Sequence, residues 1–369
     1  MLKICHICPS FNNVIYSQLV EREIENGDEI RVFYYRAKGT ELLNGEKKYV
    51  DGTTPYRNID RISFYYKENK ILRVYLNIYK KNQFNIIHAH TLFSAGFIAY
   101  KVKKRWEIPY IVAVRATDIN DFFKKRFYLR KLGINILLNS EAIIFLSEAH
   151  KEKVFDIYIP DKYQSVIAKK TYVIPNGIDR FWIDNKSIKQ KKLENSKRIR
   201  LIYYGDINSN KNVGKSIEAC KILIREGYEI EFNIIGKILE KKYLKLLTKE
   251  EFIIYKEFME KENLIEHLRR SDVFIMPSKS ETFGLSYVEA MSQGVPIIYS
   301  EGQGFDKQFE EGKVGYKVIP KNEYDIVAKI KMILNNYEEV SKNCLANINR
   351  FTWDNISKQY QEIYHNILK

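Results

Sequence analysis

The sequence predicts an α/β protein with two domains, each built around a doubly wound parallel sheet. Short runs rich in Val, Ile, Phe and Tyr alternate with longer amphipathic runs along the whole chain. This pattern is typical of parallel strands joined by helical crossovers. The alternation stops in a polar, lysine-rich stretch at 184–198 and then begins again. Because 369 residues can form two hydrophobic cores, we expect two Rossmann-like domains rather than one large sheet.

In the first half of the chain, each expected strand is a short, mostly apolar run. These strands are expected at 2–7, 30–35, 86–89, 110–114, 142–145 and 172–174. The runs between them repeat apolar residues at helical spacing, which predicts helices at 15–26, 93–105, 122–139 and 148–156. Gly27 directly follows the first helix and is expected to end it.

The second half shows the same alternation. Strands are expected at 201–204, 230–235, 273–276 and 297–299. Helices are expected at 213–226, 239–249, 264–270, 285–293, 324–335 and 355–368.

The composition limits the partners. The net charge of +15 favours nucleic acid, anionic lipid or an anionic substrate, and no nucleic-acid-binding motif supports the first. No stretch approaches the ~20 apolar residues that a membrane-spanning helix needs, and the N-terminus is too short and polar for a signal peptide. We expect a cytoplasmic protein. Cys5 and Cys8 form a C-x2-C pair with no second pair to complete a zinc site, so we expect buried, reduced thiols.

The most informative motif lies between the expected strands 273–276 and 297–299. Glu281 and Glu289 stand in an E-x7-E pattern, with a Phe-Gly-Leu turn between them. The free N–H groups of a helix that begins near Gly284 can hold an anion. Carboxylates repel phosphate but accept hydrogen bonds from sugar hydroxyls. A sugar nucleotide, which has a diphosphate between two sugars, satisfies all of these groups.

This segment resembles the donor-site signature of the retaining glycosyltransferases of the GT-B fold, specifically family 4. The resemblance implies that Glu289 holds the nucleotide ribose and that Glu281 contacts the transferred sugar. It also implies that the amides of Phe283, Gly284 and Leu285 hold the diphosphate or the sugar.

The resemblance extends over nearly the whole chain and implies two domains that face a central cleft. Residues 1–180 are then the acceptor-binding domain and residues 181–352 the donor-binding domain. The last helix, 353–369, is expected to return and pack on the first domain. The Pro-Asn-Gly-Ile-Asp segment at 175–179 is expected to be the linker.

Two loops carry the expected cations. Gly205 ends the strand 201–204 and lets backbone approach a ligand closely, and the resemblance assigns Lys211, in the same loop, to the diphosphate. The family commonly has Arg after this glycine, whereas this chain has Asp206. Arg115 stands where many members have a histidine near the reacting centre. Our hypothesis is that Arg115 replaces the missing cation; the alternative is a structural ion pair with Asp118.

On the acceptor side, the resemblance points to His90, to Asp118 and to the loop that contains Asn12. His88 shares the strand face of His90, but no third metal ligand is apparent beside them. Asp118 and Asp121 do not form the D-x-D of a metal-dependent transferase. We therefore expect no metal and no cofactor, with a nucleotide-diphosphate sugar as co-substrate.

The stretch 122–132 is basic and aromatic at helical spacing. It can lie against an anionic membrane surface, or it can be an amphipathic helix with its aromatic residues in the core.

These features together predict a retaining glycosyltransferase that moves a sugar, with a UDP-sugar as the expected donor, to a glycan or lipid-linked glycan acceptor. The resemblance implies attack from the face that the diphosphate leaves, and a role in capsule, exopolysaccharide or O-antigen assembly. The alternatives are a sugar-nucleotide 2-epimerase of the same fold and an inactive glycosyltransferase-like scaffold.

Overall fold

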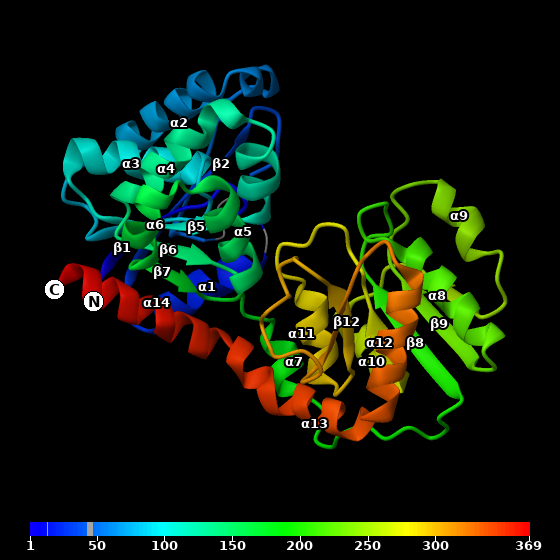
Figure 1. Cartoon of the computed structure of the whole chain (residues 1–369). Coiled ribbons are helices and arrows are strands. Elements are labelled where there is room, and N and C mark those ends of the chain that lie inside the picture. The colour runs from blue at the N-terminus through cyan, green and yellow to red at the C-terminus, as the bar shows by residue number, and fades with distance from the viewer. Residues whose placement is uncertain (13, 43–46) are drawn as a thin grey trace. The chain divides into compact units, whose positions relative to one another are not determined.

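The structure is a computed structural model of the chain that describes residues 1–12, 14–42 and 47–369. The chain divides into two compact units (Figure 1). Unit 1 contains Met1–Leu146, Lys151–Gly177 and Trp353–Lys369, and unit 2 contains Ser147–His150 and Ile178–Thr352. In the structure the long segment of unit 2 thus begins at residue 178, whereas the expected boundary was after residue 180.

Unit 1 is built on a seven-stranded sheet in which all strands are parallel, in the order β3-β2-β1-β4-β5-β6-β7. The strands are β1 (Lys3–Ile7), β2 (Glu29–Ala37), β3 (Val50–Tyr56), β4 (Ile86–Ala89), β5 (Tyr110–Val114), β6 (Ala142–Phe145) and β7 (Thr171–Val173). The order reverses between β1 and β4. In open parallel sheets, ligands bind beyond the carboxyl ends of the strands at such a switch point.

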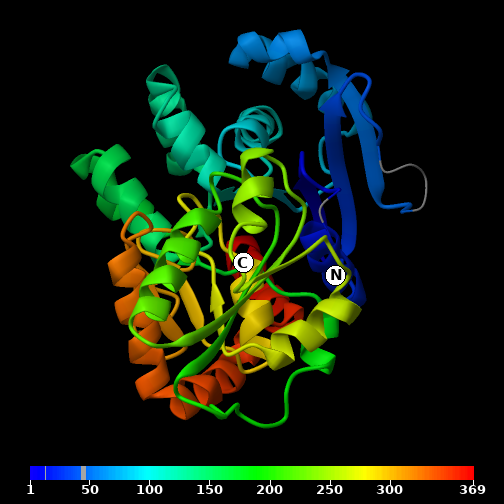
Figure 2. The same ribbon diagram turned by 90° about the vertical axis from the view of Figure 1, so that its right-hand side faces the viewer.

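Helices cover both faces of this sheet. They are α1 (Val14–Glu25), α2 (Phe64–Ile78), α3 (Ser94–Trp106), α4 (Arg130–Asn139), α5 (Glu148–Tyr158), α6 (Asp161–Ala168) and α14 (Trp353–Leu368). Successive strand residues point to opposite faces: Ile4 packs in the core formed with α1 and α14, and Cys5 in the core formed with α2, α3 and α4. Figures 1 and 2 show α14 (red) beside α1 (blue).

Unit 2 repeats the plan with a six-stranded parallel sheet in the order β10-β9-β8-β11-β12-β13. The strands are β8 (Arg198–Tyr204), β9 (Glu229–Ile235), β10 (Ile253–Lys256), β11 (Val273–Ile275), β12 (Ile297–Ser300) and β13 (Gly315–Val318). The helices are α7 (Arg180–Asp184), α8 (Val213–Arg225), α9 (Lys242–Leu247), α10 (Lys261–Arg270), α11 (Leu285–Ser292), α12 (Glu323–Asn335) and α13 (Tyr337–Asn347). The predicted pair of doubly wound parallel sheets is confirmed.

The prediction of one helix over 122–139 is wrong. A turn of π-helix, η2 (Asp118–Phe123), is followed by a 3-10 turn, η3 (Phe127–Leu129), and only then by α4. Arg126 interrupts the helix because its backbone is non-helical, with φ −110° and ψ 62°. The aromatic residues consequently separate: Phe123 is buried in the core, whereas Phe127 is 72% exposed.

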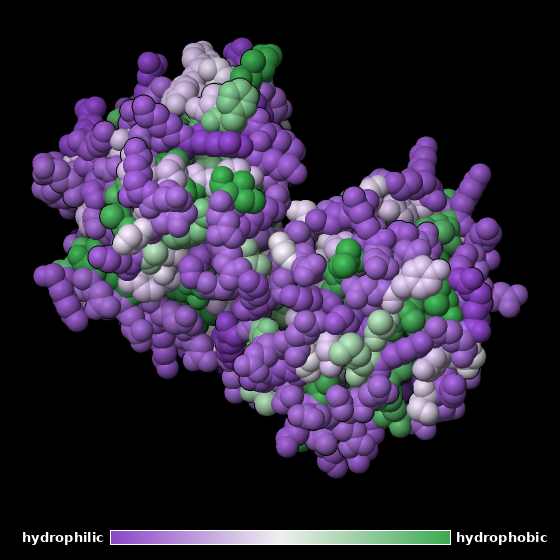
Figure 3. Space-filling view, viewed as in Figure 1, coloured by the Kyte–Doolittle hydropathy of each residue, from purple (hydrophilic) through white to green (hydrophobic). Residues whose placement is uncertain are grey.

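The surface agrees with the charged composition. On the face shown in Figure 3, hydrophilic residues cover most of both units and hydrophobic side chains occur in small groups. Within the described ranges, the structure contains no helix of the length and apolar character needed to cross a membrane. All four cysteines are free and buried, and burial raises the pKa of the Cys5 and Cys8 thiols to about 12.

Candidate active site

In unit 2, the loops after β8 and β11 meet at the carboxyl ends of their strands. The backbone N–H of Lys279 donates to the carbonyl of Asn210 at 2.8 Å, and Asn210 Nδ2 donates to the carbonyl of Ser280 at 2.8 Å. These bonds join two loops that lie 70 residues apart in the sequence. The loops contain most of the residues that the sequence analysis assigned to the donor.

Lys211 and Glu281 form an ion pair across these two loops. Lys211 Nζ lies 2.6 Å from Glu281 Oε2, and the two side chains are 22% and 13% exposed. The other carboxylate oxygen of Glu281 accepts the N–H of Thr282 at 3.1 Å. The pair brings together a cation suited to phosphate and a carboxylate suited to sugar hydroxyls.

Gly284 sets the start of α11. Its φ of 83° and ψ of 68° lie in the left-handed region, and a Cβ at this position would overlap the ring of Tyr287. Glycine is therefore required here, and the first N–H groups of α11 follow the loop that holds Glu281. The side chain of Phe283 has a structural role, because its ring is 1% exposed and packs near Phe305 and Phe351. Only the backbone amide of Phe283 can therefore contact a ligand.

Glu289 lies one turn inside α11, as the spacing predicted. Its Oε2 accepts a hydrogen bond of 2.6 Å from the hydroxyl of Tyr204, the last residue of β8. Burial raises the pKa of Glu289 to about 7, and hydrogen bonds from Tyr204 and Trp182 act against this rise. Near neutral pH the group therefore exchanges readily between the carboxylate and the protonated form. Sequence reasoning missed Tyr204 and Trp182, because neither belongs to a recognisable motif.

Two glycines bring the ends of β8 and β9 together. Gly205 has a φ of 131° and Gly236 a φ of 149°, and a Cβ on Gly236 would overlap the carbonyl oxygen of Gly205. This close backbone approach explains why glycine follows β9, whereas the positive φ of Gly205 explains why glycine follows β8. Asp206, in the position where an arginine was expected, is exposed, and its carbonyl accepts the hydroxyl of Tyr203 at 2.7 Å.

In unit 1, Asp118 fastens the loops that follow β4 and β5. Its carboxylate accepts the backbone N–H groups of Leu92 at 3.0 Å, Phe93 at 3.1 Å and Arg115 at 2.9 Å. Within the described residues no direct ion pair joins the Arg115 guanidinium to Asp118, so the alternative of a direct ion pair is not borne out. Burial raises the pKa of Asp118 to about 6, although the charge of Arg115 lowers it at longer range.

The hydrogen-bond partners of the Arg115 guanidinium are neutral. Its Nε donates to the carbonyl of His90 at 3.2 Å and its Nη1 to Asn176 Oδ1 at 3.4 Å, and the group lies 5.7 Å from the centre of the Tyr16 ring. Arg115 is 7% exposed, and among the described residues no carboxylate lies within ion-pair distance of it, although its charge lowers the pKa of Asp118 at longer range. A buried cation with no carboxylate in direct contact favours an anionic ligand. Asn12 is exposed in the loop after β1.

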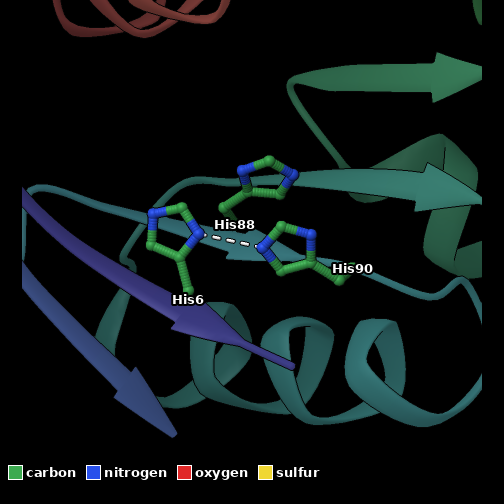
Figure 4. A group of neighbouring side chains, drawn as sticks. All are labelled: His6, His88 and His90. Atoms are coloured by element: carbon green, nitrogen blue, oxygen red, sulfur yellow. Dashed lines mark hydrogen bonds between the residues drawn. The ribbon is translucent and has the colours of Figure 1, made fainter. Parts of the chain in front are cut away.

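His88 and His90 belong to a cluster of three buried histidines, and His6 is the member that sequence reasoning missed (Figure 4). His6 on β1 is the register partner of His88 on the neighbouring strand β4. His6 Nδ1 lies 2.9 Å from His90 Nε2, and the rings of His88 and His90 stack 4.0 Å apart. The expectation that no third ligand stands beside His88 and His90 is therefore wrong, since one nitrogen from each ring lies within 4.8 Å of the others.

The contacts of this cluster form a chain of close polar groups that ends on α14. His6 Nε2 faces Glu23 Oε2 at 2.8 Å, Glu23 Oε1 accepts the hydroxyl of Tyr364 at 3.0 Å, and this hydroxyl lies 2.7 Å from His88 Nδ1. Burial lowers the pKa of His88 and His90 well below the ordinary value, so both rings are neutral. Imidazole lone pairs lie in the ring plane, so the stacked rings of His88 and His90 do not direct theirs to one point. The arrangement suits a proton-sharing network better than a metal.

The strand orders of both units, with a ligand-suited loop cluster at the strand ends, place the protein among the two-domain α/β enzymes of the Rossmann type. Residues 14–180 match the family described as Glycosyltransferase Family 4, and residues 184–350 match Glycosyl transferases group 1. The chain belongs to the group 1 glycosyltransferases of the GT-B fold.

Relatives and solved structures agree with this. The capsular polysaccharide biosynthesis glycosyltransferase CapM of Staphylococcus aureus is 24% identical over 318 residues, which is 81% of each chain. The lipopolysaccharide outer core galactosyltransferase WaaB superposes with a TM-score of 0.77 at 16% identity over 99% of both chains. Anabaena HepE, solved with UDP-glucose, has a TM-score of 0.68 at 15% identity and covers 99% of this chain and 100% of its own.

Proposed function

We propose that this glycosyltransferase moves a sugar from a nucleotide-diphosphate sugar to a glycan or lipid-linked glycan acceptor, with retention of the anomeric configuration, in the assembly of a cell-surface polysaccharide. The observation that carries the proposal is the Lys211–Glu281 ion pair of 2.6 Å beside the Gly284 turn that starts α11. This site combines a cation, free helix N–H groups and two carboxylates, which are the groups that a sugar nucleotide needs.

The donor binds unit 2 in this proposal. Lys211 and the N–H groups of Gly284 and Leu285 hold the diphosphate, and the glycine-lined end of β8 at Gly205 allows the ligand to approach. Glu289 accepts hydrogen bonds from the ribose. A uridine nucleotide is proposed as the donor because HepE, with the same fold, was solved with UDP-glucose.

The acceptor hydroxyl attacks the anomeric carbon from the face that the diphosphate leaves. The new C–O bond forms as the bond to the diphosphate oxygen breaks, and the departing phosphate oxygen takes the proton of the hydroxyl. Lys211 and Arg115 stabilise the negative charge of the leaving diphosphate, and Glu281 positions the sugar. These protein cations supply the positive charge, so the proposal needs neither a divalent metal nor a cofactor.

The acceptor side of the proposal uses unit 1. His90 and Asn12 are the proposed acceptor-side residues, and Asp118 holds the two loops that present Arg115 and Leu92. The capsule and lipopolysaccharide names of CapM and WaaB support a glycan or lipid-linked glycan as acceptor.

An anionic membrane surface is a proposed partner, contacted through 122–132, and the proposed location is the cytoplasm or the inner face of the plasma membrane. Within this stretch, Phe127 and Tyr128 are 72% and 57% exposed, and Lys124 and Lys125 are exposed as well. Exposed aromatic rings next to cations suit the interface of an anionic bilayer.

Product analysis tests the proposed function. The protein is incubated with UDP-glucose, UDP-galactose and UDP-N-acetylglucosamine, each with and without membranes from a polysaccharide-producing cell. The proposal expects UDP release that depends on acceptor, and a glycan product whose new linkage has the donor's anomeric configuration. A changed sugar nucleotide formed from donor alone would instead indicate an epimerase, and an inverted linkage would refute retention.

A further inference from the structure

The carboxylate of Glu289 has polar neighbours from several elements of unit 2. The hydroxyl of Tyr204, at the end of β8, lies 2.6 Å from Oε2 of Glu289 and 2.9 Å from the carbonyl oxygen of Ser286. The indole of Trp182 on α7 also lowers the pKa of the carboxylate. Asp179 and Lys261, which form an ion pair of 2.8 Å, act on the same pKa through their charges. Tyr204 and Trp182 are themselves buried, at 9% and 2% exposure.

Part of this environment comes from Asp179, the last residue of the segment that was expected from the sequence to be a linker. Asp179 caps α7 by accepting the N–H of Phe181 at 2.8 Å, and the same carboxylate holds Lys261 at the start of α10. The start of the short helix α7 is thereby tied to α10, and α7 also packs beside α11, the helix that contains Glu289. Tyr204 is positioned independently, because it ends β8 directly before the Gly205 turn.

These contacts have a geometric consequence. The last torsion of a glutamate side chain is broad, so an uncontacted carboxylate rotates freely about it. A hydrogen bond to Oε2 from a buried tyrosine fixes this rotation and leaves defined lone pairs for a ligand. Hydrogen bonds to a charged group also favour its charged form over the protonated one, which opposes the effect of burial on Glu289.

We propose that Tyr204 and Trp182 are positioning residues that favour the ionised form of the Glu289 carboxylate and orient it to accept the two vicinal hydroxyls of a nucleotide ribose. This inference rests on the proposed function, since it assigns the orienting groups of the same donor site. Tyr204 and Trp182 act through Glu289, and they do not themselves take part in sugar transfer.

Calorimetric titration with UDP tests the inference on the full-length protein. The variants are Glu289→Ala, Tyr204→Phe and Trp182→Phe, and Tyr337→Phe is the matched control. Tyr337 loses an equally buried hydroxyl contact, to the carbonyl of Asp272 at 3.0 Å, but does not touch Glu289. We expect about 10- to 100-fold weaker UDP binding for Tyr204→Phe, in the range of one hydrogen bond to a charged group, and no change for Tyr337→Phe.

A second arm compares UDP with 2′,3′-dideoxy-UDP. The wild type should discriminate strongly between the two, Glu289→Ala should lose the discrimination, and Tyr204→Phe should retain only part of it. A uniform loss of affinity for both nucleotides in Tyr204→Phe would indicate a merely structural role and would refute the inference.

A third arm measures UDP affinity from pH 5.5 to 8.5. The pKa of Glu289 is about 7, so UDP binding should weaken as the pH falls through this value. Tyr204 lowers this pKa, as does Lys261, whereas Asp179 raises it. Removing the Tyr204 hydroxyl should therefore move the midpoint to higher pH. An unchanged midpoint would contradict the inference.

The outcomes separate the two proposals. If the wild type binds UDP and Glu289→Ala does not, while Tyr204→Phe matches the wild type at every pH, the donor site stands and the positioning roles fall. If the wild type binds none of UDP, ADP and GDP, the proposed donor site falls and the inference with it.

Discussion

Lys211 Nζ lies 2.6 Å from Oε2 of Glu281, although the two residues are 70 positions apart in the chain. Each was expected from the sequence to face the donor, and the structure shows that they also hold each other. The ion pair connects the loops after β8 and β11, and it therefore fixes the two charges that the transfer reaction is proposed to use. This relationship leads to the first prediction.

Replacing Lys211 by alanine should lower kcat by about 10²- to 10³-fold, the effect typical of removing one charge-stabilising group from a transition state. Lys215→Ala is the matched control, because Lys215 pairs with Glu218 and Glu323 on the same unit, outside the loop of Lys211. The measurement is the rate of UDP release with donor and acceptor. Equal rates for the two variants would remove Lys211 from the mechanism.

Gly284→Ala should disrupt the start of α11. The new Cβ would overlap the Tyr287 ring at a φ of 83°, and a strained backbone of this kind costs on the order of 1–3 kcal/mol. Gly302→Ala is the control, since its φ of 67° carries the same backbone strain but its Cβ meets no atom within 4 Å. Thermal unfolding and UDP titration should show the greater loss of stability, and of binding, for Gly284→Ala. Identical losses would mean that backbone strain alone accounts for the effect.

The fold was predictable from the sequence because most strands in the middle of the sheets are continuous apolar runs. The three strands that escaped prediction, β3, β10 and β13, are all at sheet edges. An edge strand is partly exposed, and β3 even contains glycine and proline. Its pattern is therefore that of a loop rather than of a buried strand.

The site was predictable only where one short motif contained its residues. Glu281, Gly284 and Glu289 stand close together in the sequence, and Lys211 could be added by resemblance. Trp182 and His6 could not be found in this way. Tertiary packing brings Trp182 to the donor site and His6 to the histidine cluster, and neither residue belongs to a local motif. For His6 a signal existed: β1 and β4 are neighbours in the sheet, so His6 and His88 share one face.

Arg115→Ala should lower turnover more than donor affinity. The hydrogen-bond partners of the guanidinium are neutral and the residue is 7% exposed, which suits the proposed role of its charge toward the leaving diphosphate. We expect a decrease in kcat of about 10- to 100-fold with a smaller change in UDP affinity. Arg115→Lys should recover part of the loss, because it keeps the charge without the fork geometry. Unchanged donor affinity and turnover in Arg115→Ala would refute the role.

Phe127→Ser combined with Tyr128→Ser should reduce sedimentation with vesicles of phosphatidylglycerol. The two rings are 72% and 57% exposed, and the neighbouring lysines should make the binding weaker at high salt and with phosphatidylcholine. Tyr324→Ser is the control, since Tyr324 is 67% exposed in unit 2. If the wild type does not sediment with anionic vesicles, the membrane proposal is wrong, and Phe127 and Tyr128 are exposed side chains without a membrane-binding role.

The buried histidines predict a steep loss of stability in acid. Burial lowers the pKa of His88 and His90 well below 6.5, so the unfolded chain binds more protons than the folded one below about pH 6.5. Their contribution is present above that pH and is lost as the pH falls, by up to roughly 1.4 kcal/mol per pH unit for each histidine.

Urea unfolding at pH 5, 6 and 7 measures this dependence. His90→Gln should flatten it, because glutamine takes up no proton. His365→Gln is the matched control, since His365 is exposed on α14 and should leave the slope unchanged. If His90→Gln shows the full wild-type slope, His90 takes up its proton in the folded state as readily as in the unfolded one. The interpretation of His90 as a neutral member of this buried polar cluster would then have to be abandoned.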